Sequence, residues 1–405
     1  MPEPTQPWLV VPRDPVIVRD GRPFGPDPGA RAQSLPFPFP ATLAGAVRTR
    51  HGEQHGGFDT GAVKPADVRA LPVRGPFLVQ LAGDANSTAR LLLPTPADAL
   101  LLPKTDQHPP RRGWLRPLAI DAGAQSDLTA HGQPDAPFWP VGMAAPEAVK
   151  PLAEPPTFWW WDAYQEWLLA PGDGDINPGA LGLRGLIAES RVHVRIDPAS
   201  GTAVEGFLYQ TSGREFTHRP TAKPVWGLAD TATLALLVMT GADLDEGLGS
   251  LGGERRTVFW QRGDATLLPT CSAALRDAIQ TTQTCRLLLA TPGIFAQGLL
   301  PQLDWLQIPD LKLAIKGAVA SRYDVISGWD YAHEPRGQAK PTRRLAPAGT
   351  VYYLSLAGNS EAAIDQFIEQ VWLQPISDAK QDRLDGFGVA LLGVWDGKQH
   401  RMEVK

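Results

Sequence analysis

The sequence predicts an α+β fold of two units with a proline-rich irregular insertion. Its 405 residues correspond to about two or three domains at roughly 150 residues each. Predicted strands alternate with single helices and with hairpins, and βαββαβ is the economical arrangement for each unit. The 40 prolines exclude a helical bundle or a coiled coil, because proline interrupts long helices.

Composition and charge narrow the class further. The 40 glycines and 40 prolines are about a fifth of the chain, below the roughly 25–30% typical of low-complexity disorder. A net charge of −5 gives no global basic signature, so a bound nucleic acid would need a local basic strip. Two cysteines are too few for a disulfide framework and lack metal spacing. No secretion signal or apolar run of about 18 residues is present, so a cytoplasmic protein without membrane contact is expected.

The first hundred residues predict the element order β, α, β, β. Residues 8–18 are rich in β-forming residues but carry two prolines, which cannot donate to a strand ladder. Thr42 is predicted to cap a short helix that ends at a pair of glycines. Residues 71–81 and 89–93 flank a polar turn and predict a hairpin.

The middle of the chain predicts an insertion and a hairpin. Residues 93–156 are rich in proline and show little periodicity, and a single helix is predicted after them at 157–170. Two alternating β runs flank a turn of Pro, Ser and Gly within residues 191–210, which is the clearest hairpin pattern in the sequence.

The second half predicts another α+β unit that begins near Val225. Its predicted elements are a strand at 233–241, a helix near 272–283, strands at 285–290, 311–327 and 350–357, a helix at 360–371 and a strand at 388–395. These predictions give one domain at 1–220, with the insertion at about 93–180, and a second domain at 221–405 with glycine-rich loops.

A glycine motif at 247–252, GLGSLG, matches the dinucleotide-binding pattern but lacks its context. A strand-like run follows it where that site needs a helix, so a pyrophosphate site is excluded. The loop ends in Glu254, Arg255 and Arg256. Glycines allow a close backbone approach and paired arginines bind phosphate, whereas the alternative is a structural loop with solvated charges.

Three other segments are candidates for phosphate contact. A second glycine loop at 385–393 leads into the last predicted strand, although a bulge or turn would explain its glycines equally. Residues 336–344 carry four positive charges and no acid, which suits a basic loop for phosphates. Residues 111–116 are similar and add Trp114, which could stack a base. For each basic segment the alternative is a solvated surface.

Aromatic and histidine candidates favour structural roles. Tryptophans at 159–161 and at 167 lie on a predicted helix, where packing is favoured over sugar binding. His51 and His55 are one helical turn apart, and a surface pair is favoured over a metal site. His193 shares a strand face with two arginines, as an acid–base group or as part of a polar sheet face. No carboxylate pair or Ser/His/Asp set stands out.

Several strings, in order along the chain, resemble one family. They are DPVIVRDGRPFG near the start, SLPFPFPATLAGAVRT at the first helix, SRVHVRIDPASGTAVEGFLYQ in the middle, then LGGERR, ISGWDY, APAGTVYYL and the terminal DGFGVALLG. Together they look like the third subunit of the Cmr complex, a type III-B CRISPR RNA-guided effector of the RAMP superfamily. The resemblance spans nearly the whole chain.

The resemblance implies two ferredoxin-like (RRM-like) domains packed together. It implies a non-catalytic subunit that holds the 5′ tag of the guide RNA, beside the large polymerase/cyclase-like subunit and the first backbone subunit, in antiviral defence. No cofactor is implied. The chain has no aromatic string of the RNP type, so loops rather than a sheet face are expected to contact RNA.

The residues predicted to bind RNA combine both lines of reasoning. They are Arg255, Arg256, Lys340, Arg343, Arg344, Gly386, Gly388 and Gly393. The superfamily's glycine-rich loop matches the three glycines, and its LGGE-R string matches residues 251–255. The alternative hypothesis is a metal-independent endoribonuclease that matures guide RNA, with His51 or His193 as the acid–base group.

Overall fold

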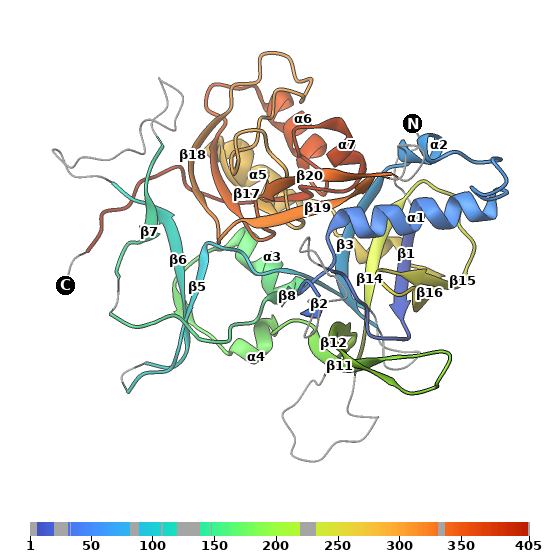
Figure 1. Cartoon of the computed structure of the whole chain (residues 1–405). Helices are drawn as coiled ribbons and strands as arrows, with labels where there is room; N and C mark the ends of the chain where they lie inside the picture. Colours follow the sequence, from blue (N-terminus) through green and yellow to red (C-terminus); the bar gives the residue numbers. More distant parts are fainter. Residues whose placement is uncertain are drawn as a thin grey trace.

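The computed structural model in Figure 1 describes residues 6–19, 31–32, 34–81, 89–106, 108–119, 138–146, 148–218, 232–330 and 337–403. Within these ranges the chain has many strands and few helices, as expected for an α+β protein. It forms two main sheets, one in an N-terminal unit and one in a C-terminal unit.

The larger sheet belongs to the N-terminal unit. Its strands are β1 (Gln6–Pro12), β3 (Val73–Gln80), β4 (Arg90–Pro94), β8 (Phe158–Trp160), β10 (Gly182–Leu183), β14 (Ala232–Thr240), β15 (Gly247–Leu251) and β16 (Arg256–Arg262), with β13 (Thr217–His218) beside β14. The strand order is β10-β8-β4-β3-β14-β1-β16-β15. The four central strands, β3-β14-β1-β16, are all antiparallel and follow the order of a βαββαβ unit.

Only one crossover helix of that arrangement is found in the N-terminal unit. Helix α1 (Pro40–Gln54) links β1 to β3 and lies across the sheet, with the short α2 (Pro65–Arg69) after it (Figure 1). Residues 241–255, between β14 and β16, carry β15 and no helix. Helix α1 starts with proline in its first turn, where a missing N–H costs nothing, so it begins two residues before Thr42.

The sheet boundary differs from the predicted domain boundary at residue 220. Strand β14 lies between β1 and β3, and β16 pairs with β1, so the N-terminal sheet continues to residue 262. An apolar run predicts a buried strand, but it carries no information about which sheet that strand joins. The connection from β3 to β14 covers residues 81–231 and is longer than the predicted insertion at about 93–180.

This connection holds a small sheet, two helices and a hairpin. The sheet contains β5 (Ala99–Leu102), β6 (Arg111–Pro117), β7 (Val141–Met143) and β9 (Gly174–Asp175), and the helices are α3 (Trp161–Leu169) and α4 (Pro178–Leu181). The hairpin predicted at 191–210 is confirmed as β11 (Ile187–Ile196) and β12 (Ala203–Glu215), with β2 (Arg31–Ala32) along β12. It projects from the body of the molecule (Figure 1).

The C-terminal unit has the same strand order, but it lacks the first crossover helix instead of the second. Its elements are η3 (Ala265–Leu267), α5 (Ala273–Thr282), β17 (Thr284–Leu289), β18 (Ala314–Val319), β21 (Val351–Ser355), α6 (Glu361–Val371), α7 (Lys380–Leu384) and β22 (Ala390–Gly393), with the hairpin β19 (Asp324–Asp330) and β20 (Gln338–Leu345). The antiparallel order is β18-β21-β17-β22. Helix α6 is the second crossover, whereas residues 290–313 contain no helix. Two complete βαββαβ units are therefore not found.

Serine caps explain where the two longest helices of this unit begin. The Ser272 hydroxyl accepts a hydrogen bond from the Leu275 N–H at 3.3 Å, and the Ser360 hydroxyl accepts one from the Ala363 N–H at 3.2 Å. Both helices bury an apolar stripe against β17 and β21, in a core that includes Ile279. The helices predicted at 272–283 and 360–371 are confirmed.

The two sheets pack against each other through the faces opposite α1 and opposite α5 and α6, and α3 adds Tyr164, Trp167 and Leu168 to the core between them. This shared core contains Leu9, Val11, Phe77, Val79, Ala235 and Leu237 from the N-terminal sheet, and Leu288, Val351, Tyr353 and Leu391 from the C-terminal sheet. Helix α1 covers the opposite face of one sheet, and α5 and α6 cover the opposite face of the other. The faces on which an RRM stacks bases are thus largely buried, which leaves edges, hairpins and loops as the exposed parts of both sheets.

A buried ion pair joins the insertion to the C-terminal sheet. Arg286 of β17 and Asp98 have no side-chain exposure, and Nη1 of Arg286 lies 2.6 Å from Oδ2 of Asp98. The Trp167 indole N–H of α3 donates to Oδ1 of Asp98 at 2.9 Å, and the Arg286 Nε donates to the Val394 carbonyl at 2.9 Å. The Tyr353 hydroxyl lies 3.4 Å from the same carboxylate. We call these residues the Asp98 cluster. Its contacts join Asp98, helix α3 and the C-terminal sheet.

None of the helices in the described ranges is long and apolar enough to cross a membrane. In the same ranges, no three or more His, Cys, Asp or Glu side chains gather as a metal site would require.

Candidate nucleic-acid interface

Three of the predicted RNA-binding cations lie on one hairpin of the C-terminal unit. Lys340, Arg343 and Arg344 are all on β20, which pairs with β19. Lys340 and Arg344 are exposed, and the Arg344 guanidinium lies 4.8 Å from the centre of the Tyr323 ring. That ring is itself 42% exposed. The strand therefore presents a cation and an accessible aromatic ring together, a combination suited to single-stranded RNA.

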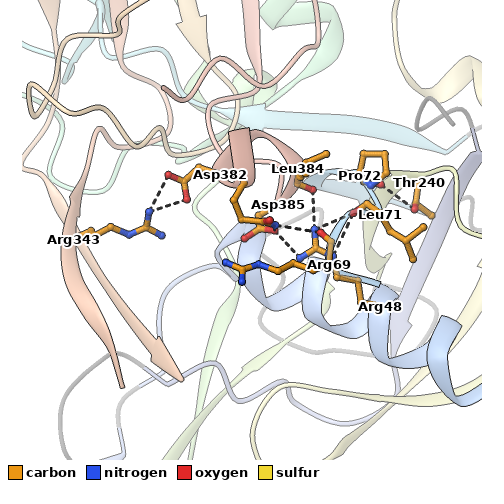
Figure 2. A network of polar contacts seen from close by, with 10 residues as sticks. Arg48, Arg69, Leu71, Pro72, Thr240, Arg343, Asp382, Leu384 and Asp385 are labelled. Atoms are coloured by element: carbon orange, nitrogen blue, oxygen red, sulfur yellow. Dashed lines mark hydrogen bonds and ion pairs between the residues drawn. The ribbon is translucent and has the colours of Figure 1, made fainter. Parts of the chain in front are cut away.

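Arg343 differs from its neighbours because it is paired with an acid. Its Nη1 donates to both carboxylate oxygens of Asp382 at 2.8 and 2.9 Å, a contact that Figure 2 shows between β20 and α7. Burial raises the pKa of Asp382, and Arg343 opposes this effect by favouring the charged form. Arg343 thus has a structural partner, whereas no acid among the described residues forms an ion pair with Lys340 or Arg344.

Replacing Arg343 by alanine should destabilise the protein more at pH 7 than near pH 4. At pH 7 the variant leaves a buried carboxylate without its partner, which costs about 1–3 kcal/mol. Near pH 4 the carboxyl of Asp382 binds a proton in the folded variant, because its pKa lies above the ordinary value. Urea unfolding at both pH values measures the difference, and Arg343→Ala combined with Asp382→Asn should remove it. An equal loss at both pH values would contradict this role.

Helix α7 also joins the C-terminal unit to the N-terminal unit. Nη1 of Arg48 in α1 lies 2.6 Å from Oδ1 of Asp385, and Gln381 donates to the same oxygen at 2.8 Å. We call the contact of α7 and Asp385 with α1 and β20 the seam. Both of its acids have partners: Asp382 is paired with Arg343, and Asp385 is paired with Arg48. Figure 2 shows the side chain of Arg69 extending beside Asp385 towards Arg343.

Four exposed cations surround this seam. They are Arg69, Lys340, Arg344 and Lys380, which we call the seam surface. Lys340 is close enough to α7 to lower the pKa of Asp382, behind the larger effects of burial and Arg343. Because the neighbouring acids already have arginine partners, the seam surface is locally positive on a chain whose net charge is −5. Sequence reasoning missed Arg69 and Lys380, since they become neighbours of β20 only through α7.

Arg255 and Arg256 lie on a different hairpin, in the N-terminal unit. Arg255 lies in the turn between β15 and β16, where Glu254 and Arg255 have positive φ values of 57° and 48°, and Arg256 is the first residue of β16. Arg255 is exposed. Nη2 of Arg256 lies 2.6 Å from Oε2 of Glu254, and its side chain is 15% exposed. The structure therefore does not bring all five predicted cations onto one hairpin.

The turn at Arg255 lies near the polar face of the projecting hairpin. The segment around residue 16 lies between the turn and the projecting hairpin. Ile17 pairs with Gly253 of the turn, and residue 16 pairs with Arg214 of β12. Asp14 in this segment has a lowered pKa, chiefly from the Thr257 backbone N–H, with smaller contributions from Arg256 and from Arg191 of β11. Charged residues of both hairpins therefore lie close enough to Asp14 to lower its pKa.

The polar face of the projecting hairpin combines cations with aromatic rings. We call it the arm surface, and it comprises Arg191, His193, Arg195, Phe207 and Tyr209. The His193 ring stacks on Tyr209 with centroids 5.1 Å apart, and the Arg195 guanidinium lies 5.2 Å from the Phe207 ring centre. The face shared by His193 and its two arginines is confirmed as a polar sheet face, and pairing with β12 adds the rings that sequence reasoning missed.

The three predicted RNA-binding glycines are packed inside the protein. Gly386, Gly388 and Gly393 are buried. The Gly386 N–H donates to the Arg383 carbonyl at 3.1 Å, and the Gly388 N–H donates to the Pro292 carbonyl at 2.7 Å. Gly393 is in β22 opposite Arg286. Packing thus explains these glycines, and their N–H groups are engaged within the chain rather than presented as an anion nest.

The basic segment at 111–116 also has partners within the chain. Arg112 stacks over Trp167 at 4.6 Å and lies 3.7 Å from Glu166, while Arg116 lies 3.3 Å from Asp173. The Trp114 indole N–H donates to the Tyr353 hydroxyl at 3.1 Å. This segment is part of the structural core around the Asp98 cluster.

The tryptophans and histidines take structural positions as well. Trp159 and Trp167 are fully buried, and Trp160 is 8% exposed, which confirms packing over sugar binding. The rings of His51 and His55 have centroids 4.1 Å apart, and Nδ1–H of His51 donates to the Asp243 carbonyl at 3.1 Å. His51 at the end of α1 and His193 on β11 are on separate elements.

Comparison with known proteins gives one family. The model of the CRISPR-associated protein family Cas_Cmr3 matches residues 8–395, across both units and the insertion. A search of the curated proteins gives no match. A chain of the cryo-EM structure of the Type III-B Cmr-beta bound to cognate target RNA is 14% identical, with a TM-score of 0.44 and 86% of each chain covered. A chain of the complex bound to cognate target RNA and AMPPnP, state 1, is 14% identical, with a TM-score of 0.41, covering 90% of this chain and 89% of that chain.

Proposed function

The chain belongs to the Cas_Cmr3 family of CRISPR-associated proteins, and from this premise we propose that it is a non-catalytic RNA-binding subunit of a type III-B Cmr effector. In this role it holds the 5′ tag of the guide RNA. It also bridges the large polymerase/cyclase-like subunit and the first backbone subunit, in antiviral defence.

The observation that carries the RNA-binding proposal is the seam surface. Its four cations come from both units, and two acids beside it, Asp382 and Asp385, are already bound by Arg343 and Arg48. Among the described residues no acid forms an ion pair with Lys340 or Arg344, so a phosphate backbone that crosses this surface would meet positive charge there. Tyr323, beside Arg344, supplies an exposed ring for stacking.

The burial of the two facing sheet surfaces supports the same conclusion. Because the two sheets cover each other, an extended RNA strand is expected along the hairpins and the seam rather than across a sheet. Arg255 and the arm surface offer a second stretch of cations and rings in the N-terminal unit. We propose that the guide strand uses the seam surface first and that the arm surface extends its path.

Replacing both Lys340 and Arg344 by alanine should weaken binding of tag RNA by about tenfold at physiological salt. Each lost phosphate contact removes roughly 0.7 units from the slope of log affinity against log salt for a single strand, so the slope should fall by about 1.4. Fluorescence anisotropy with a labelled tag oligonucleotide, over a range of KCl concentrations in EDTA, measures both quantities.

The matched control is Lys398→Ala with Arg401→Ala, which removes two exposed cations from the C-terminal segment. This control should leave the slope unchanged. Equal effects of the two double variants would contradict a site at the seam. If the labelled RNA is instead cut in EDTA, and His193→Ala or His51→Ala abolishes the cutting, the endoribonuclease hypothesis replaces this one.

A further inference from the structure

A cavity of about 410 Å³ opens beside β20, the strand that the structure forms where the sequence predicted a basic loop. It lies between β20, the start of α7 and residues 294–298, and we call it the 294 cavity. Its lining includes Ile294, Phe295, Ala296, Arg343, Arg344 and Asp382. Its volume falls within the roughly 300–1,000 Å³ typical of small-molecule sites, so a planar group of one or two rings fits inside.

The acids that line the cavity are already engaged. Oδ2 of Asp378 accepts the Ala296 N–H at 2.7 Å, and Oδ1 accepts the Gln302 N–H at 2.8 Å. Asp382 accepts two contacts from Arg343. The negative charge of these acids is therefore already balanced by their partners. Arg343 and Arg344 also line the cavity.

Three of the backbone donors along residues 294–298 are engaged as well. The Ile294 N–H donates to the Ser377 hydroxyl at 3.0 Å, and the Gly298 N–H donates to the Phe295 carbonyl at 3.1 Å. The Ala296 N–H is held by Asp378. These three N–H groups are not available to read the edge of a base, so we expect the apolar lining of Ile294 and Phe295 to favour an occupant by its flat surface more than by its hydrogen-bonding pattern.

We propose that the 294 cavity holds one unstacked nucleobase of the bound RNA, with the Arg344 guanidinium on a flanking phosphate. This inference rests on the proposed RNA-binding function and adds a specific site to it. An apolar wall of Ile294 and Phe295 beside two guanidinium groups matches a nucleotide, which is apolar at the base and anionic at the phosphate. An apolar protein side chain would fill the cavity but would leave the cationic mouth unused.

The test compares RNA oligonucleotides of the tag sequence that each lack one base. Loss of the base that enters the 294 cavity should weaken binding to the full-length chain about tenfold, because the stacked contact is lost. Exchange of that base for any other should change the affinity less than twofold. Anisotropy in moderate salt measures the whole series.

A cavity-filling variant makes the assignment specific. Ala296 is exposed, so Ala296→Phe fills the 294 cavity with little change in the core, whereas Ala362→Phe adds the same ring on the exposed side of α6. In Ala296→Phe, intact RNA should bind no better than RNA that lacks the critical base, while Ala362→Phe should retain the tenfold difference. Thermal melting checks that both variants are folded.

The failures of the two proposals are distinguishable. If RNA binds but no base deletion weakens binding, or if the penalty persists in Ala296→Phe, the cavity proposal is wrong and the RNA-binding function stands. A strong preference for one base at the critical position would also overturn it, since the engaged N–H groups cannot discriminate. If the full-length chain binds none of the oligonucleotides, both proposals fall.

Discussion

Replacing Asp98 by alanine is expected to lower the free energy of unfolding by about 3–5 kcal/mol, the largest effect of any single substitution considered. Arg286 and Asp98 are both fully buried, so the variant leaves a guanidinium charge in the core without its counterion. It also removes the acceptor of the Trp167 indole N–H. Guanidinium denaturation followed by tryptophan fluorescence reports the change, because Trp114 and Trp167 surround the pair.

An exposed ion pair provides the control for the Asp98 variant. Arg184 and Glu154 form a salt bridge whose side chains are 72% and 69% exposed, so Glu154→Ala should cost less than about 1 kcal/mol. A second control replaces both buried partners, Asp98→Leu with Arg286→Met, and should recover most of the loss because no unpaired charge remains. Equal losses for Asp98→Ala and Glu154→Ala would show that the Asp98 cluster is not a stabilising junction.

The Asp98 cluster has no signal in the sequence. Asp98 lies in a proline-rich segment and Arg286 in an apolar strand, 188 positions apart. A single charged residue within an apolar run predicts a partner of opposite charge, because unpaired buried charges are unstable, but it does not identify that partner. The residues that define the junction could therefore be found only from the fold.

Local patterns were sufficient for most secondary structure. Alternating residues around a Pro-Ser-Gly turn predicted the β11–β12 hairpin, and the sequence patterns near 272–283 and at 360–371 predicted α5 and α6. These signals are confined to a few neighbouring residues, so they survive without tertiary information. The helix predicted at 157–170 is shorter, because residues 158–160 pair with β4 and β10 as β8.

Sheet membership and layer order could not be predicted in the same way. Strand β14 is apolar along its length because the helix α1 covers one face and the second sheet covers the other. The same pattern would arise in either unit, so the boundary at residue 220 had no physical basis in the sequence. The burial of the two facing sheet surfaces likewise depends on a contact between units.

The candidate site was predictable in part, since β20 carries clustered cations whose exposure the structure confirms at Lys340 and Arg344. The carboxylate of Asp382, 39 positions from Arg343, could not be assigned as its partner from the sequence. The glycine-rich loop was the weaker signal, because glycine is required both where a backbone meets a ligand and where two backbones meet each other. The structure favours the second reason at Gly386.

Replacing Gly386 by alanine is expected to lower the free energy of unfolding by about 2–4 kcal/mol while leaving RNA affinity unchanged. Gly386 has a φ of 89°, and a Cβ there would lie 2.7 Å from the Val73 carbonyl oxygen and 2.9 Å from that of Gly75. The left-handed conformation alone costs an alanine roughly 1–2 kcal/mol, and the contacts with two carbonyls force α7 and β3 apart. Chemical denaturation measures the stability, and anisotropy at a temperature where the variant is folded measures the affinity.

Gly57 separates the two parts of this cost. Its φ is 81°, close to that of Gly386, but a Cβ there would have no atom within 4 Å. Gly57→Ala should therefore show only the conformational cost, and the additional loss in Gly386→Ala measures the close packing of the two units at the seam. If the glycine loop instead cradles phosphates, the two variants should lose similar stability, and only Gly386→Ala should weaken RNA binding. The comparison therefore decides whether this loop contacts RNA or holds α7 against β3. In the second case the loop fixes α7 in the position where Lys340 and Arg69 flank the same seam.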